Sequence, residues 1–208
     1  MDYIKNPAAI YEKSFALIKQ EADLSAFNDS EGEVVIRLIH ACGMVDIVDD
    51  LVFSDGAIKI GRAALTSGTP IICDVKMVAK GIIKRKLKYQ NQILCGLDGA
   101  GANEFALKNN TTRTVGGVEI LREQIDGAII AIGNAPTALF HLLEMVEKGL
   151  VKPALILGFP VGFVGAVESK QALIENKLGV EFIALRGRRG GSAYAASCVN
   201  ALAAGLAI

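Results

Sequence analysis

Two residues of this 208-residue chain have the types and the spacing for acid–base chemistry. His40 follows Arg37 by three positions in a segment with helical periodicity, so both side chains are expected on one face of a helix. An imidazole with an ordinary pKa of about 6.5 exchanges protons near neutral pH. Arg37 would favour the neutral imidazole and could bind a carboxylate. A histidine packed in the core is the alternative for His40, and we interpret His141 in that way.

The helix that carries this pair is predicted to begin at a capping box, Ser30–Glu33, and to end at Gly43. An earlier helix is predicted to follow Asn6 as its N-cap and to end near Glu21. Ser14 lies within the apolar stripe of that earlier helix. From its position alone, we interpret Ser14 as a core serine bonded to its own backbone.

Short apolar segments of strand length alternate with helical patterns over the rest of the chain. The expected strands are 50–54, 70–75, 92–96, 127–132, 154–158 and 181–185. The clearest helices between and after them are 134–148, 167–178 and 192–207. Near-continuous apolar strands separated by helices are typical of a mostly parallel sheet that is covered on both faces. The sequence therefore predicts one α/β domain with five or six strands.

Ligands of parallel α/β sheets bind beyond the carboxyl ends of the strands, so the residues after each strand form a second group of candidates. Glycines there allow close backbone approach, and arginines bind carboxylates or phosphates. This edge is expected to bind a large anionic ligand, although residues 186–189 alone also fit a solvated turn. The expected ligand-binding residues of this group are Asp74, Met77, Gly162, Ser169, Arg186, Gly190 and Ser192.

Composition excludes several classes of protein. The chain has 22 basic and 22 acidic residues, and this neutrality argues against a nucleic-acid-binding protein. No apolar stretch is long enough for a membrane helix, and the first residues do not resemble a secretory signal, so we expect a cytoplasmic protein. Four scattered cysteines and two histidines predict reduced thiols and no metal site. Motifs for a P-loop, a dinucleotide site and a serine hydrolase are missing.

Five segments together resemble the precorrin-8X methylmutase family, including its cobalt-precorrin-8 members. They occur in the family's order along the chain. The segments are Arg37–Gly43, Pro70–Val78, Ile132–Leu139, Gly158–Val164 with Glu168–Lys170, and Arg186–Ser192. Cys73 stands where the family often has threonine, and no expected role depends on it.

The resemblance implies a Rossmann-like α/β/α homodimer that uses no cofactor. Residues 1–45 would form N-terminal helices that carry the catalytic residue, and residues 46–208 would form the α/β core of a single domain. The implied reaction moves a methyl group from C11 to C12 of precorrin-8X or cobalt-precorrin-8, and it yields hydrogenobyrinate or cobyrinate. His40 matches the family's active-site histidine, which acts at the ring nitrogen beside the migrating methyl group. Ser14, Arg37 and, less directly, Arg113 match substrate contacts.

The chemistry of the implied substrate agrees with this match. A flat macrocycle with several carboxylates needs apolar walls, close backbone approach and cationic donors, which the glycine-rich loops and the arginines provide. Two other functions fit the residues as well. One is a tetrapyrrole carrier without catalytic activity. The other is an α/β enzyme that acts on another polyanionic metabolite, such as a sugar phosphate.

Overall fold

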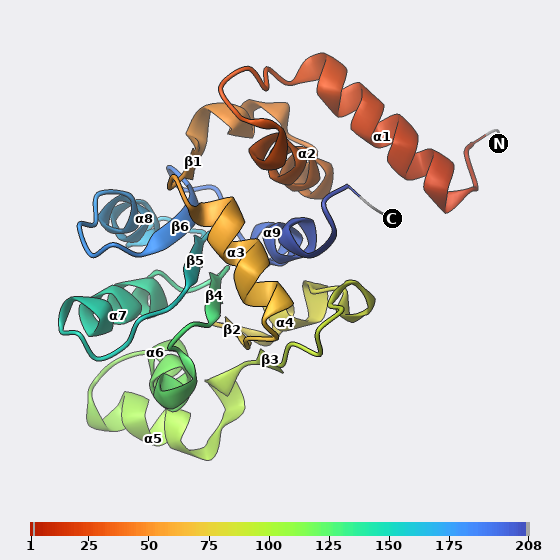
Figure 1. The fold of residues 1–208 in the computed structure, drawn as a ribbon. Coiled ribbons are helices and arrows are strands. Elements are labelled where there is room, and N and C mark those ends of the chain that lie inside the picture. The colour runs from red at the N-terminus through yellow and green to blue at the C-terminus, as the bar shows by residue number, and fades with distance from the viewer. Residues whose placement is uncertain (2, 207–208) are drawn as a thin grey trace.

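A six-stranded sheet forms the centre of the protein in the computed structural model, which describes residues 1 and 3–206 (Figure 1). The strand order is β1-β6-β5-β4-β2-β3. Strand β1 is antiparallel to β6, and the other neighbouring pairs are parallel. The strands are β1 (Leu51–Phe53), β2 (Ile71–Cys73), β3 (Ile93–Leu94), β4 (Ile129–Ile132), β5 (Leu155–Gly158) and β6 (Glu181–Leu185). Each lies within a predicted apolar segment, so the α/β class and the mostly parallel sheet are confirmed.

Helices cover both faces of this sheet. The α-helices are α1 (Pro7–Glu21), α2 (Asp29–Cys42), α3 (Ala57–Thr66), α4 (Lys76–Gly81), α5 (Ala100–Lys108), α6 (Arg113–Glu119), α7 (Pro136–Glu147), α8 (Ala166–Ile174) and α9 (Ser192–Ala204). Short 3₁₀ turns include η1 (Val45–Asp50), directly after the end of α2. Helices α3, α4 and α9 lie on one side of the sheet and α6, α7 and α8 on the other (Figure 1).

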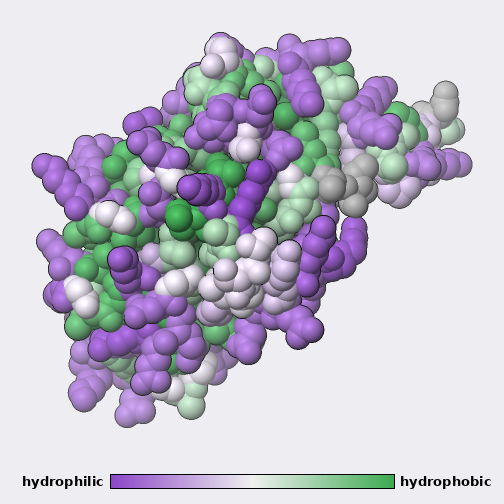
Figure 2. Space-filling view, in the orientation of Figure 1, coloured by the Kyte–Doolittle hydropathy of each residue, from purple (hydrophilic) through white to green (hydrophobic). Residues whose placement is uncertain are grey.

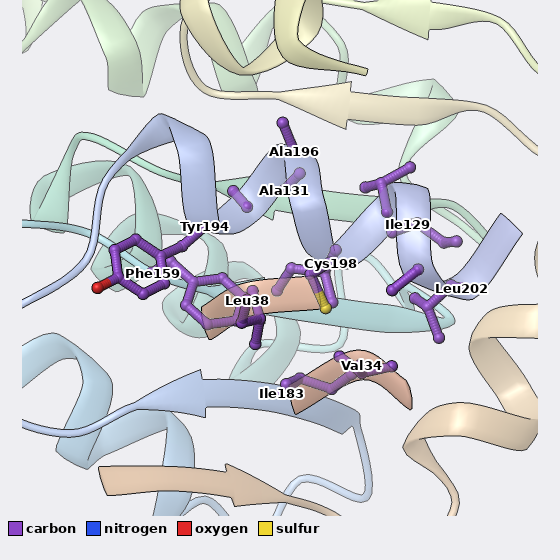
Figure 3. Packing of buried hydrophobic residues seen from close by; sticks show 14 of the residues in the cluster. Val34, Leu38, Ile129, Ala131, Phe159, Ile183, Tyr194, Ala196, Cys198 and Leu202 are labelled. Carbon is purple, nitrogen blue, oxygen red and sulfur yellow. The ribbon is translucent and has the colours of Figure 1, made fainter. Parts of the chain in front are cut away.

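Helix α9 is the central helix of the larger core. Its residues Cys198 and Leu202 lie between the sheet, represented by Ile129, and helix α2, represented by Val34 and Leu38 (Figure 3). The sequence left open whether this alanine-rich helix is a core helix or a subunit contact, and its burial now assigns it to the core. The predicted helix extended to residue 207, which lies outside the described residues, whereas α9 ends at Ala204.

The start of α2 differs from the prediction. The capping box is formed by Asn28 and Glu31, two residues before the predicted pair. The Asn28 side chain accepts hydrogen bonds from the backbone N–H groups of Ser30 and Glu31, at 3.0 and 3.1 Å. Glu31 in turn accepts from the Asn28 N–H at 3.0 Å. The predicted end is confirmed, because Gly43 has φ +71°, a left-handed conformation that terminates helices.

Helix α1 packs outside α2 and projects from the body of the molecule, where Figure 2 shows mixed hydrophobic and hydrophilic side chains. Phe15 and Ile18 are buried on its inner side. Ile10 and Leu17 are exposed. The N-cap Asn6 is confirmed, since its side chain accepts from the Ala9 N–H at 3.1 Å. In the described residues, we find no helix with the length and apolarity that a membrane span requires.

Candidate functional site

Helices α1 and α2 bring Ser14 and His40 into contact. The Ser14 Oγ lies 2.8 Å from the His40 Nδ1, although 26 positions separate the two residues. The interpretation of Ser14 as a serine bonded to its own backbone is therefore wrong. The imidazole ring also packs against two aromatic rings, with centroids 5.0 Å from Tyr11 and 5.3 Å from Phe15. These contacts fix the orientation of a half-buried histidine.

Arg37 lies one turn before His40 on the same helix. It is only 5% exposed, and its Nε donates a hydrogen bond to the carbonyl of Gly205. Its guanidinium lies over the Phe15 ring, 5.5 Å from the centroid. Burial lowers the pKa of His40, and the positive charge of Arg37 lowers it further. The imidazole is therefore mainly neutral at pH 7, as the spacing of this pair predicts.

A neutral imidazole bonded at Nδ1 has defined chemistry at its other nitrogen. When the Ser14 hydroxyl donates to Nδ1, the ring proton is on Nε2 and can be donated. When Nδ1–H donates to the serine, Nε2 is an acceptor. Ser14 thus couples the tautomer of His40 to the direction of one hydrogen bond. The arrangement suits exchange of a proton with a basic nitrogen of a ligand.

A second group of predicted site residues lies along the carboxyl edge of the sheet, and Asp74 organises one part of it. Its carboxylate accepts hydrogen bonds from the backbone N–H groups of Gly133, Asn134 and Ala135, at 3.0, 2.8 and 2.8 Å. Asp74 is buried, and this burial raises its pKa while the N–H donors oppose the rise. The structure therefore gives this carboxylate a role in shaping the loop between β4 and α7.

The loop after β6 is held by two cations. Lys170 is fully buried, and its Nζ donates to the carbonyl of Arg189 at 2.6 Å. Burial lowers the pKa of Lys170 to about 8. The Arg189 guanidinium donates to Asp46 and Asp50 of η1, at 2.7 Å each. The loop is therefore tied to the segment that follows α2. Arg189 does not fit the solvated turn that remained an alternative for this loop.

The other predicted residues of this edge differ in exposure. Met77 is 73% exposed, and Arg113 and Arg186 are exposed as well. Gly162 has no side chain to offer a ligand, and its N–H donates to the Arg188 carbonyl. Ser192 is buried at the start of α9.

Gly190 and Ser169 are enclosed by their neighbours. Gly190 lies so close to the Phe159 carbonyl that a Cβ would approach it within 2.4 Å. Ser169 is fully buried, and its hydroxyl donates to the Ala166 carbonyl at 3.3 Å, so it supports helix α8 and does not face the edge.

Two groups of predicted residues thus occupy different parts of the fold. Ser14, Arg37 and His40 form one cluster between α1 and α2. The remainder follow the carboxyl edge of the sheet, except Ser169, which is enclosed in α8. The ion pairs from Arg189 to η1 connect the two parts. Sequence reasoning missed Lys170 and Arg189 as structural anchors. A lysine directly after Ser169, on the buried side of a helix, was the available signal for the first.

His141 differs from the core interpretation in part. Its side chain is 21% exposed, and its Nε2 lies 2.8 Å from a Glu119 carboxylate oxygen. Among the residues that the structure describes, no three histidine, cysteine or acidic side chains are grouped as metal ligands. A cavity of about 330 Å³ lies near the end of α9, with Glu33, Arg62 and Asn91 in its lining.

Comparison with known proteins extends these observations. The family model described as precorrin-8X methylmutase matches residues 9–204. A precorrin-8X methylmutase of Pseudomonas aeruginosa is 52% identical over 203 residues, 98% of each chain. A cobalt-precorrin-8 methylmutase of Priestia megaterium is 38% identical and covers 94% of this chain and 87% of its own.

The fold agrees with this match. A solved structure of precorrin-8X methylmutase from Thermus thermophilus superposes with a TM-score of 0.86, at 37% identity and with 94% of each chain covered. The residues that the family model matches, 9–204, include α2, the sheet and all but the first two residues of α1. On these grounds the chain belongs to the precorrin-8X methylmutase family.

Proposed function

We propose that this protein catalyses the methyl shift from C11 to C12 of precorrin-8X, with His40 as the group that acts at the ring nitrogen beside the migrating methyl group. The contact between the Ser14 hydroxyl and the His40 Nδ1 carries the proposal. It joins two residues that the family resemblance assigns to the substrate, and it leaves Nε2 to face a ligand. The match over residues 9–204 supports the same assignment.

Proton exchange with the macrocycle explains how one histidine could accelerate this reaction. A proton on the ring nitrogen makes the conjugated system electron-poor, and methyl migration becomes easier. A positioned acid of this kind contributes about 10²–10⁴-fold. The remaining acceleration comes from holding the macrocycle in a reactive shape. Substrate carboxylates near His40 would raise its lowered pKa and increase its protonated fraction.

Sequence identity to the two kinds of relative favours precorrin-8X, the substrate without cobalt, over cobalt-precorrin-8. The Pseudomonas aeruginosa relative, named for precorrin-8X, shares 52% of its residues with this chain, whereas the Priestia megaterium relative, named for cobalt-precorrin-8, shares 38%. We infer that precorrin-8X is the preferred substrate. Parallel assays with both substrates at equal concentration test this preference.

A homodimer in the cytoplasm is also part of the proposal. Helix α1 projects from the body (Figure 1), and Ile10 and Leu17, seven positions apart on one side of this helix, are both exposed. A second copy that covers this side would remove these side chains from water. Light scattering of the purified protein should give the mass of a dimer.

The decisive experiment compares His40→Ala with His141→Ala. The control removes the other histidine of the chain, which is bonded to Glu119 and lies on a different helix. We expect His40→Ala to lose turnover of precorrin-8X to hydrogenobyrinate, followed by absorbance, while it still binds hydrogenobyrinate. Full activity of His40→Ala would refute the proposed role. Tight pigment binding by the wild-type protein without conversion would instead identify a tetrapyrrole carrier.

A further inference from the structure

The loop between β5 and α8 exposes an unusual amount of apolar surface. Phe163 is 84% exposed and Val164 is 89% exposed, and Val161 and Val167 are exposed beside them. Single exposed apolar side chains are common, but a contiguous group marks a contact surface. The group lies just beyond the carboxyl end of β5, the edge at which parallel α/β sheets bind ligands.

This apolar loop is held in a fixed shape. The Gly162 N–H donates to the Arg188 carbonyl at 3.2 Å, and the Gly191 N–H donates to the Phe159 carbonyl at 2.8 Å. These bonds join the loop to residues 186–191, which Lys170 and Arg189 anchor to α8 and η1. The exposed side chains are therefore presented by a preorganised backbone, which reduces the entropy lost when a ligand binds.

Cations accompany the apolar group. The Arg188 guanidinium lies 5.2 Å from the centroid of the Phe163 ring. This contact orients the guanidinium, while the highly exposed phenyl ring remains accessible. Arg186 and Arg188 are both exposed, whereas Arg189 is bound to two aspartates. The surface thus combines an aromatic ring with oriented donors for carboxylates.

Close-packed glycines join the loops beside this surface. Gly133 lies against the backbone of Ser192, and Gly190 lies against the carbonyls of Phe159 and Pro160. Larger side chains at these glycines would collide with the neighbouring backbone. These glycines therefore let the loops of this edge pack closely together, which fixes the frame that presents Phe163.

We propose that Phe163 and Arg188 form a recognition platform for the macrocycle, in which the ring system stacks on Phe163 and a peripheral carboxylate accepts hydrogen bonds from Arg188. This inference rests on the proposed function, because that function supplies a flat ligand with several carboxylates. Charge and shape favour this occupant: the oriented arginine matches a carboxylate, and the exposed phenyl face matches a planar ring. A second copy of this chain is the other occupant that such a surface fits.

Binding of hydrogenobyrinate, measured by absorbance titration, tests the platform. Phe163→Ala should weaken binding roughly 3- to 10-fold, the usual worth of an aromatic pair, and Phe163→Tyr should restore it. Arg188→Gln should weaken binding about 10-fold or more, and the salt dependence of the affinity should decrease. As controls, Leu107→Ala changes an exposed apolar residue of α5, and Arg122→Gln changes an arginine of the 3₁₀ turn η4 (Arg122–Gln124). Both variants should bind as the wild type does.

The possible outcomes distinguish the macrocycle from a second copy of the chain as the occupant of this surface. They also distinguish failure of the platform from failure of the proposed function. Wild-type affinity in both Phe163→Ala and Arg188→Gln overturns the platform while the proposed function stands. A change from dimer to monomer mass in Phe163→Ala, measured by light scattering, assigns the surface to a second copy and also overturns the platform. Failure of the wild-type protein to bind hydrogenobyrinate overturns the proposed function together with this inference. Weakened binding at unchanged mass supports the platform.

Discussion

Replacement of Lys170 by methionine should remove a specific pH dependence from the stability of the protein. The amine is fully buried, and its pKa falls from 10.5 to about 8. Because one pKa unit corresponds to about 1.4 kcal/mol, burial of the charged amine destabilises the fold by about 3 kcal/mol at pH 7.

The sign follows from proton binding. Between pH 8 and 10.5, the unfolded chain keeps the proton on Lys170 and the folded chain loses it, so the free energy of unfolding rises with pH in this window. Below pH 8 the amine is charged in both states, and Lys170 adds no slope. Lys170→Met lacks this rise but keeps a side chain of similar length.

Urea unfolding of both proteins at pH 7, 8, 9 and 10 measures the difference. The other titrating groups cancel in the comparison, and the lost hydrogen bond to Arg189 adds an offset that does not depend on pH. We expect the free energy of unfolding of the wild type, relative to that of the variant, to rise by about 1 kcal/mol per pH unit above pH 8. A difference that stays constant from pH 7 to pH 10 would refute the assignment of a low pKa to Lys170.

Two further predictions concern the two parts of the site. Nuclear magnetic resonance titration of the His40 ring should give a midpoint below 6.5, because burial and Arg37 disfavour the charged form; a midpoint above 6.5 would contradict the electrostatic argument. Asp74→Ala leaves three backbone N–H groups without their acceptor and should destabilise the fold by about 3 kcal/mol, or roughly 6–12 °C in Tm. An unchanged Tm in scanning calorimetry would show that water or a solute anion replaces the carboxylate.

The sheet was predictable because its inner strands β2, β4, β5 and β6 are buried almost throughout. Their apolar segments are therefore nearly continuous, and the class of fold follows from their alternation with helices. The direction of β1 was not predictable, because the pairing of Leu51 with Leu185 joins residues 134 positions apart and leaves no local pattern. The start of α2 was misplaced for another reason: Asn28 with Glu31 and Ser30 with Glu33 have the same spacing.

The candidate site was predictable in part. Arg37 and His40 share one helix, so their spacing placed them together. The contact of His40 with Ser14 depends on how α1 packs against α2, which residue spacing does not specify. The partner of Lys170 is a backbone carbonyl, a group that every residue has, so no residue type indicated it. The roles of these residues toward a substrate remain predictions until the variants are measured.

Asp74 has a consequence for how this architecture relates to nucleotide-binding proteins. In dinucleotide-binding folds, N–H groups at the start of a helix after a parallel strand hold a pyrophosphate. Here the chain supplies the anion itself, because the Asp74 carboxylate occupies the N–H groups that precede α7. The Asp74 carboxylate orders the loop between β4 and α7 when the chain folds, so this loop does not need a bound ligand to order it. It also blocks a diffusible phosphate from that helix terminus, so a familiar scaffold becomes available for a ligand of another shape.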